Sequence, residues 1–311
     1  MLSRQFLTDM CRLSTLAYRE NSFVSDIYDN FNFCRPHNNE LSVLEKCINC
    51  PKLIQGDLTK ETDILQNDAQ VYVSKYQESL AVVFRGTESF RDVLTDLNMI
   101  RVSMDLPNVS QHERPKVHWG FLRQFRCVEK EVSEEIEKFI EKSDGDGDGG
   151  DGDGGDGNGG DGNGDDGNGG VRGGDSKHVV FSGHSLGGAL ATLAAVQFSK
   201  QYPNIIVSCV TFGSPRVGNS LFASMFDKCC SGSYRFVNED DPVPMGPTPI
   251  RFTHVKGGRW IDDDVLLHQK PWMRSLTFFK NLFLSVFGVT HNPLSDHGCA
   301  SYLNFISSMK E

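Results

Sequence analysis

A serine stands at the centre of the segment Gly183-His184-Ser185-Leu186-Gly187, which has the spacing G-x-S-x-G. The apolar run Val179-Val180-Phe181 precedes it and a series of small residues follows it. This order predicts a sharp turn between a strand and a helix, which presents a serine hydroxyl for attack on a carbonyl carbon. Residues two before and two after that serine must lack bulk, as Gly183 and Gly187 do. We therefore expect covalent catalysis with Ser185 as the nucleophile.

A serine hydroxyl is a poor nucleophile unless a histidine takes its proton and a carboxylate orients that histidine. With this motif, the acid and then the histidine are expected downstream of the serine. Glu239, Asp240 and Asp241 directly follow the predicted strand Tyr234 to Val237. Spacing alone does not choose among the three acids.

Four histidines follow these acids, at positions 254, 268, 291 and 297. His254 lies within the strand-like run Ile250 to Val255 and is interpreted as structural. His291 and His297 precede the apolar stretch Ala300 to Ile306, which is predicted to be a helix. We favour His297 as the base because it is nearer that helix, and His291 remains the alternative.

The tetrahedral intermediate of acyl transfer needs two hydrogen-bond donors at its oxyanion. The amide of Leu186, at the start of the predicted helix, can supply one of them. The other is expected after an earlier strand. Thr87 follows the run Leu80 to Arg85, and Gly86 allows a sharp turn there.

The elements that must position these groups are visible in the hydrophobic pattern. A helix is predicted at the start of the chain, a pair of strands over 70–76 and 80–85, and a helix over 121–142. Downstream, the pattern predicts a strand (178–182), a helix (186–199) and two strands (205–212 and 234–237). Continuous apolar strands that alternate with helices indicate the α/β class, with a sheet covered on both faces. We expect one domain over residues 1–311.

Residues 144–170 contain only Gly, Asp and Asn, and the nine aspartates account for nine of the ten net negative charges. The tract has no side chain that could bury apolar area, so we expect a disordered insertion within the domain. A calcium-binding β-roll is the alternative, but such rolls need a large apolar residue in each repeat. The rest of the chain is nearly neutral and has no basic stripe, which argues against nucleic-acid binding.

The first twenty residues carry several charges and lack the apolar core of a signal peptide. The charge-free run His178 to Ser199 is long enough to imitate a membrane helix, but the glycine-rich motif interrupts it. The nine cysteines are an odd number, which favours reduced thiols over a disulfide framework. From these features we expect a cytoplasmic location or one peripheral to intracellular membranes.

Five blocks of sequence, in order, resemble the fungal-type, or class 3, lipase family of α/β-hydrolases. The blocks are Val83 to Thr87, Val117 to Phe121, Gly183 to Ala191, Thr211 to Asn219 and Asp241 to Pro244. The resemblance implies an α/β-hydrolase fold and a triad of Ser185, Asp241 and His297. It also implies an oxyanion contact at Thr87 and a lid over residues 89–100. Residues 268–290 are longer than in the compact secreted members, and the signal and disulfides of those members are missing.

The expected function is hydrolysis of lipid esters by a serine esterase through an acyl-enzyme. The residues leave open whether the substrate is a triacylglycerol, a phospholipid, a monoacylglycerol or another ester. No cofactor and no metal are expected for this reaction. A catalytically silent lipid-binding module is the alternative. A weaker alternative is zinc binding by two pairs of residues, Cys34 with His37 and Cys47 with Cys50. It is weaker because the two pairs are closer together in the sequence than in usual zinc ribbons.

The segment 272–287 is rich in apolar residues. It begins after Pro271 and ends before Gly288, as a helix would. Its large apolar residues recur at helical spacing, so it is either a core helix or a surface that contacts lipid. In the second case it would act with the apolar residues of the lid against a membrane or a lipid droplet. The residues of this interfacial hypothesis are Phe90, Val93, Leu94, Leu97, Trp272, Phe279 and Phe283.

Overall fold

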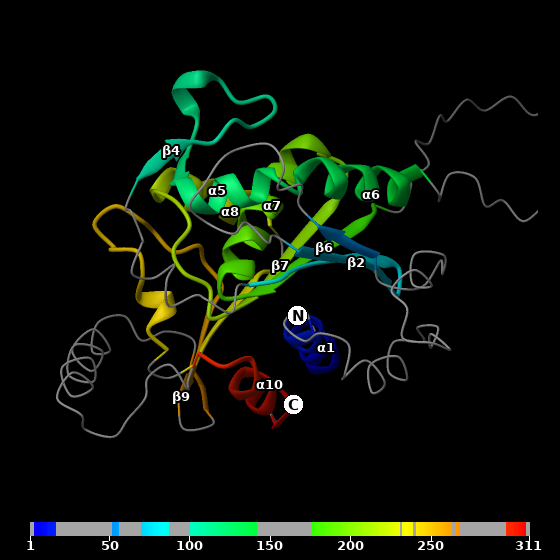
Figure 1. The fold of residues 1–311 in the computed structure, drawn as a ribbon, viewed down its shortest axis with the longest axis vertical. Helices are drawn as coiled ribbons and strands as arrows, with labels where there is room; N and C mark the ends of the chain where they lie inside the picture. Colours follow the sequence, from blue (N-terminus) through cyan, green and yellow to red (C-terminus); the bar gives the residue numbers. More distant parts are fainter. Residues whose placement is uncertain are drawn as a thin grey trace, which may run out of the picture.

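Runs of β-branched and aromatic residues form a central sheet in the computed structural model (Figure 1). The structure describes residues 3–16, 52–55, 70–86, 100–141, 176–230, 232–238, 241–262, 265–267 and 297–308. Within these ranges one sheet has the strand order β1-β2-β3-β6-β7-β8-β9-β10, and β4 pairs separately with β5. The strands are β1 (Lys52–Gln55), β2 (Gln70–Tyr76), β3 (Ser79–Phe84), β4 (Arg101–Ser103), β5 (Lys116–His118), β6 (His178–His184), β7 (Ile206–Phe212), β8 (Tyr234–Asn238), β9 (Gly258–Asp262) and β10 (Val265–Leu267).

The centre of this sheet is parallel. Strands β3, β6, β7, β8 and β9 pair in parallel, whereas β1, β2 and β10 add antiparallel edges. The predicted α/β class and the α/β-hydrolase architecture with a mostly parallel sheet are therefore confirmed. In such sheets the carboxyl ends of the parallel strands form the usual place for a site.

Helices cover both faces of the sheet (Figure 1). On one face α7 packs against β3, β6 and β7, with α5 and α8 beside α7 and α6 against β2 and β3. On the other face α1 contacts β3, β6 and β7, and α10 lies against α1 and β8. The helices within the described ranges are α1 (Arg4–Leu16), α5 (Trp119–Arg126), α6 (Glu129–Glu141), α7 (Leu186–Gln201), α8 (Ser220–Cys229) and α10 (Cys299–Ser308).

Each face has its own hydrophobic core. Helix α7 is buried over nearly its whole length, which explains why its sequence is apolar on all sides. Helix α1 buries Phe6, Leu7, Met10 and Leu13 against the other face. The run His178 to Ser199 is thus a strand and a buried helix, as the sequence predicted. No helix in the described ranges is both long and apolar enough to cross a membrane.

The structure differs from the sequence prediction in several places, and the short strands β1, β4, β5, β9 and β10 were not predicted. The predicted helix over 121–142 is two helices, α5 and α6, with a break at Cys127 and Val128. Residues 250–255 do not form a strand, because only Thr253 makes an isolated bridge, to Gly218. Helix α8 was not predicted, although Asn219 caps it by accepting a hydrogen bond from the Phe222 amide. The described residues also include two short 3₁₀ turns, η1 (Gln111–Glu113) and η2 (Val243–Met245).

Candidate active site

Ser185 lies at the turn between β6 and α7 with a strained backbone. Its φ and ψ angles are 59° and −127°, a region that residues with a side chain rarely adopt. The Ser185 amide donates to the carbonyl of Phe212 at the end of β7, at 2.9 Å. Such strain persists only where the surroundings hold it, and it is typical of functional sites.

The two glycines of the motif are required by close backbone contacts. A Cβ on Gly183 would lie 2.4 Å from the backbone of Gly187, and one on Gly187 would lie 2.1 Å from the carbonyl oxygen of Phe84. Any side chain would therefore push β3, β6 and α7 apart. The same contacts place the carboxyl end of β3, three residues before Thr87, against the turn that carries Ser185.

Asp241 and His297 contact each other through side chains 56 residues apart in the sequence. His297 Nδ1 lies 3.0 Å from Asp241 Oδ1 and 2.9 Å from Oδ2. An ionised carboxylate only accepts, so Nδ1 carries the proton and Nε2 has the acceptor lone pair. Asp241 is fully buried and also accepts from the Val243 amide at 2.9 Å. This arrangement fixes the tautomer that a general base needs.

Tyr302 on α10 supports the same carboxylate. Its hydroxyl donates to Asp241 Oδ2 at 2.6 Å and accepts from the Asn238 amide at 2.9 Å. Burial, and then the charge of Asp241, raise the pKa of Tyr302 well above its usual value, so this hydroxyl stays protonated. A protonated Tyr302 orients Asp241 towards His297.

His184, the second residue of the motif, holds the backbone of His297. Its Nε2 lies 2.7 Å from the His297 carbonyl oxygen, and the two rings are 4.5 Å apart. Burial first, and then the nearby His297, lower the pKa of His184 well below its usual value. His184 is therefore neutral and donates through Nε2. No role was predicted for His184, although its place beside Ser185 in the motif was the available signal.

One glycine lies between Ser185 and the pair formed by Asp241 and His297. Gly213 follows Phe212, the acceptor of the Ser185 amide, and has a φ of 60°. A Cβ there would lie 2.8 Å from Asp241 Oδ2 and 3.1 Å from the ring of His297. Ser185 and the pair of Asp241 and His297 thus lie on either side of the end of β7. The Ser185 hydroxyl is buried and has no hydrogen-bond partner within the described residues.

Some of the other predicted residues lie within the described part of the chain, and the rest lie outside it. Leu186 is the first residue of α7, where helix amides have no acceptor within the helix. His254 is half-buried, and its Nε2 donates to the Pro244 carbonyl at 2.7 Å. The following residues lie outside the described part of the chain: Thr87, Phe90, Val93, Leu94, Leu97, Trp272, Phe279, Phe283, Glu239, Asp240, His268, His291, Cys34, His37, Cys47, Cys50 and the tract 144–170.

Comparison with known proteins defines the class. The profile of the family "Lipase (class 3)" matches residues 81–146 and 171–250, on both sides of most of the Gly/Asp/Asn tract. A solved triacylglycerol lipase, described as having a catalytic centre formed by a serine protease triad, has a TM-score of 0.54 and 25% identity. The alignment covers 85% of this chain and 83% of that one. The chain belongs to the class 3 lipase family, as its motifs predicted.

Two relatives show how far the similarity extends. A lipase of Rhizopus niveus is 27% identical over 222 residues, which are 69% of this chain and 47% of the relative. A secreted mono- and diacylglycerol lipase of Fusarium solani is 41% identical over 85 residues, which are 27% of this chain and 25% of the relative. The chain thus spans about half the length, or less, of these relatives.

The predicted cytoplasmic or peripheral intracellular location is wrong. Relatives from Fusarium and Malassezia are named as secreted lipases, and nothing in the structure supports a cytoplasmic location. The prediction relied on the charged first twenty residues, but residues 4–16 form α1 and pack against the sheet. Their composition reflects packing in the fold and carries no information about the compartment.

Proposed function

We propose that the protein is a serine hydrolase of lipid esters, with Ser185, Asp241 and His297 as its catalytic triad. The hydrogen bond between Asp241 and His297, beside the strained turn of Ser185, is the observation that carries this proposal. His297 Nε2 takes the proton of the Ser185 hydroxyl, whose oxygen attacks the ester carbonyl. The proton then passes to the leaving alcohol, and water releases the acyl group by the same route.

The oxyanion of each tetrahedral intermediate is held by the Leu186 amide and by Thr87 in this proposal. Leu186 starts α7, so its N–H lies at the positive end of the helix dipole. Phe84 pairs with Gly183 in the parallel ladder, which brings the chain before Thr87 close to the serine. Donors fixed in this way stabilise the transition state more than the ground state.

Acylglycerols are the substrate class that the relatives favour, since their names specify mono-, di- and triacylglycerol lipases. No cofactor is needed for this chemistry. We further propose that Phe90, Val93, Leu94 and Leu97, with the segment 272–287, contact a membrane or lipid-droplet surface. This part of the proposal depends on the sequence pattern alone.

A panel of esters tests the proposed function. We expect hydrolysis of acylglycerols and of short p-nitrophenyl esters, with a steep rise in rate once the substrate forms aggregates or bilayers. The rise is expected because apolar lid residues are stabilised at a lipid surface. Phospholipids and acyl chains of several lengths complete the panel. No turnover of any ester, together with retained lipid binding, would favour a catalytically silent lipid-binding module instead.

We also propose that residues 144–170 are a disordered insertion in a single domain over 1–311. The tract lies between the end of α6 at Glu141 and the start of β6 at His178, whereas Ser185 follows the opposite end of β6. Deleting the tract is expected to change kcat and the melting temperature little, because loop length affects stability only logarithmically. Activity with and without Ca²⁺ checks this. A calcium-dependent gain in ordered structure would support the β-roll.

A further inference from the structure

Two adjacent cysteines lie where α8 ends, at the edge of the sheet away from Ser185. Cys229 is the last residue of α8, and Cys230 follows it shortly before β8 begins at Tyr234. Strands β6, β7 and β8 are parallel, so their amino ends lie at one edge of the sheet, whereas Ser185 follows the carboxyl end of β6. The pair of thiols is therefore separate from the candidate active site.

The two thiols lie close together and are partly open to solvent. Cys229 Sγ lies 3.6 Å from Cys230 Sγ and 3.5 Å from the carbonyl oxygen of Phe226. The Cys230 amide donates to the same carbonyl at 2.9 Å, which closes the last turn of α8. Both side chains are half-buried. The two sulfur atoms need to approach by only about 1.5 Å to reach the length of a disulfide bond.

The surroundings of Cys229 favour its thiolate form. The hydrogen bond from Cys230, and then Ser199 and the charge of Lys200, lower the pKa of Cys229, although partial burial opposes them. Burial, and then Cys229, raise the pKa of Cys230, which therefore stays a thiol. The thiolate is the form of cysteine that oxidants attack. A cysteine of low pKa beside a second thiol is typical of redox-active sites.

Two other cysteines show the effect of full burial. Cys209 on β7 and Cys11 on α1 are buried, and burial raises the pKa of each thiol. Such cysteines react slowly, because the thiolate is unfavourable and solvent does not reach it. Among these thiols, oxidation is therefore expected first at Cys229.

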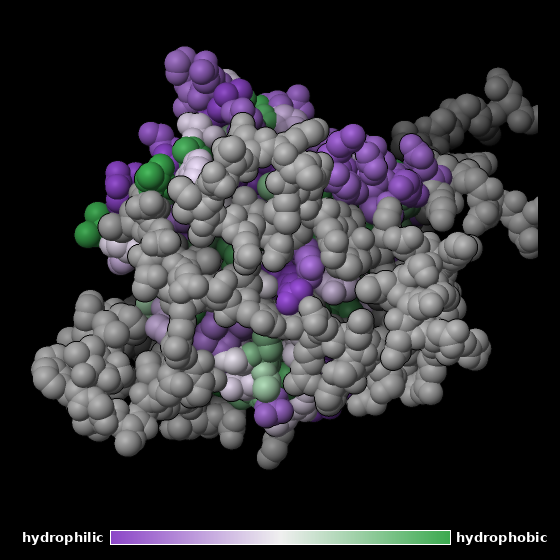
Figure 2. Space-filling model, viewed as in Figure 1, coloured by the Kyte–Doolittle hydropathy of each residue, from purple (hydrophilic) through white to green (hydrophobic). Residues whose placement is uncertain are grey.

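The last turn of α7, which carries Lys200, lies beside a polar surface. Gln201 Nε2 at the end of α7 donates to Ser133 Oγ on α6 at 2.7 Å. Figure 2 shows hydrophilic side chains over α6. An oxidant that approaches from this side is therefore one carried in water.

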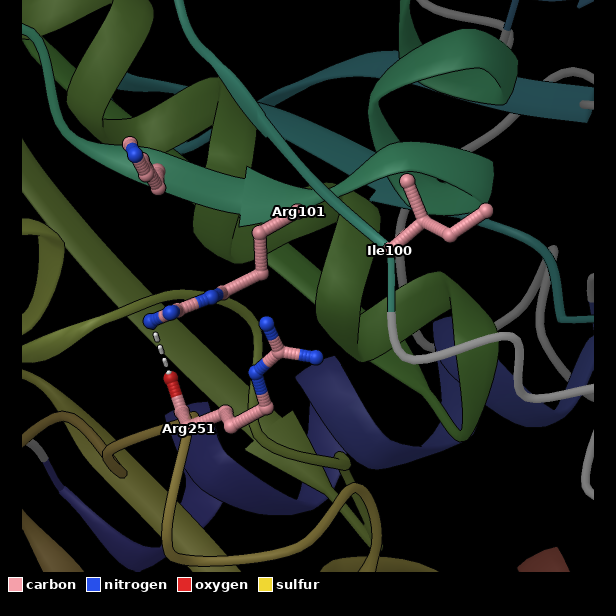
Figure 3. Close-up of a pocket in the computed structure, with 4 residues that line it drawn as sticks. Ile100, Arg101 and Arg251 are labelled. Atoms are coloured by element: carbon pink, nitrogen blue, oxygen red, sulfur yellow. Dashed lines mark hydrogen bonds between the residues drawn. The ribbon is translucent and has the colours of Figure 1, made fainter.

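A pocket at the other end of α8 does not include the two thiols. The Asn219 amide, at the start of α8, donates to the Lys116 carbonyl at 2.8 Å, and Lys116 lines this pocket. The other lining residues are Ile100, Arg101 and Arg251. The Arg101 guanidinium donates to the Arg251 carbonyl oxygen at 2.7 Å (Figure 3). Because the length of α8 separates the two places, the chemistry of the thiols does not involve this pocket.

We propose that Cys229 is a site of reversible oxidation by hydrogen peroxide, with Cys230 as the thiol that completes a disulfide. The Cys229 thiolate attacks one oxygen of the peroxide, which gives a sulfenic acid and releases the other oxygen as water. The Cys230 sulfur then attacks the sulfenic sulfur, so that the disulfide forms and a second water leaves. Two electrons pass from the two thiols to the peroxide, and the protons of both thiols end in the two waters.

The adjacent positions make this disulfide easy to reduce. Consecutive Cα atoms are about 3.8 Å apart, which is less than the separation of about 4.4 Å or more in most disulfides. The ring is therefore strained, and strained disulfides have the more oxidising potentials of labile bonds. A dithiol such as dithiothreitol is expected to restore both thiols. The proposal does not depend on ester hydrolysis.

Peptide mass spectrometry of the full chain tests the proposal. Trypsin cleaves after Lys228 and Arg235, so that both cysteines lie in one peptide, 229–235. The reduced protein is treated with hydrogen peroxide, and the remaining thiols are then alkylated in denaturant. We expect peptide 229–235 without alkyl groups and lighter by two hydrogens. Treatment with dithiothreitol before alkylation should give the doubly alkylated peptide.

Two substitutions of Cys230 separate its proposed roles. Cys230→Ser retains a hydrogen-bond donor to Cys229 but cannot form the disulfide, so dimedone should trap a sulfenic acid at Cys229. Cys230→Ala also removes the donor and is expected to lower the trapping rate about threefold, because a less stable thiolate is only partly offset by its greater nucleophilicity.

The matched control is Cys127→Ser, which removes another half-buried thiol and is expected to leave oxidation of peptide 229–235 unchanged. Thermal unfolding of each variant shows that it folds. Three results would overturn the proposal. One is a doubly alkylated peptide 229–235 under conditions that oxidise Cys127, and another is equal dimedone trapping at Cys127 and Cys229 in Cys230→Ser. The third is a disulfide from Cys229 to a second chain in place of the bond to Cys230.

Discussion

Replacing Ser185 by alanine is expected to lower kcat for ester hydrolysis by about 10⁶, while the fold remains intact. The hydroxyl is the proposed nucleophile, and the other groups of the site cannot form the acyl-enzyme without it. The Ser185 hydroxyl has no hydrogen-bond partner within the described residues, so its removal should cost little stability. Initial rates on a soluble ester, together with covalent labelling by a fluorophosphonate, measure the effect.

The matched control is Ser182→Ala, three residues earlier and within the buried strand β6. Ser182 Oγ lies 3.1 Å from Ser14 Oγ, towards α1 rather than towards His297. We expect this variant to lose some stability but to keep its labelling and kcat. Labelling or turnover that persists in Ser185→Ala would show that another residue is the nucleophile.

The second large effect is expected at Asp241 and His297. Asp241→Asn and His297→Ala should each lower kcat by about 10³ or more, because the serine loses its base or the base loses its orientation. Asn at position 241 can donate where the carboxylate only accepts, so it would favour the wrong tautomer of His297. Rates at saturating soluble ester, with thermal unfolding of each variant, separate chemistry from folding.

Two further variants, next to Asp241 in the sequence or in the structure, test whether the effect is specific to Asp241 and His297. Asp240→Asn removes the adjacent acid and is expected to have a small effect. Tyr302→Phe removes one hydrogen-bond donor to Asp241 and leaves the donors from His297 and Val243. Its loss of kcat should therefore be larger than that of Asp240→Asn and smaller than that of Asp241→Asn. If Asp240→Asn were severe and Asp241→Asn mild, the alignment of the acidic segment with the family motif would be incorrect.

The local backbone around Ser185 could be predicted because its causes are local. Glycines two positions before and after the serine, an apolar strand before it and a helix of small residues after it are all visible in the sequence. The strand–helix–strand order that follows was predicted for the same reason. Residues 250–255 show the limit of such patterns. Their composition suits a strand, but they form only an isolated bridge at Thr253.

The candidate site was predictable only in part. Among Glu239, Asp240 and Asp241, only resemblance to the family favoured Asp241, and His297 was chosen over His291 by its nearness to a predicted helix. The contact of Asp241 with His297 joins segments 56 residues apart, so no local pattern contains it. Thr87 and the lid residues lie outside the described ranges and remain predictions.

The sequence by itself determined the strand-to-helix turn at Ser185, the α/β class and the family. The tertiary structure decided which distant groups meet: Tyr302 with Asp241, His184 with His297, and Arg101 with Arg251. Backbone conformation at a turn depends on neighbours in the chain, which the sequence displays directly. Contacts between side chains on different elements depend on how the helices and strands pack, and this long-range packing is not encoded in any one segment.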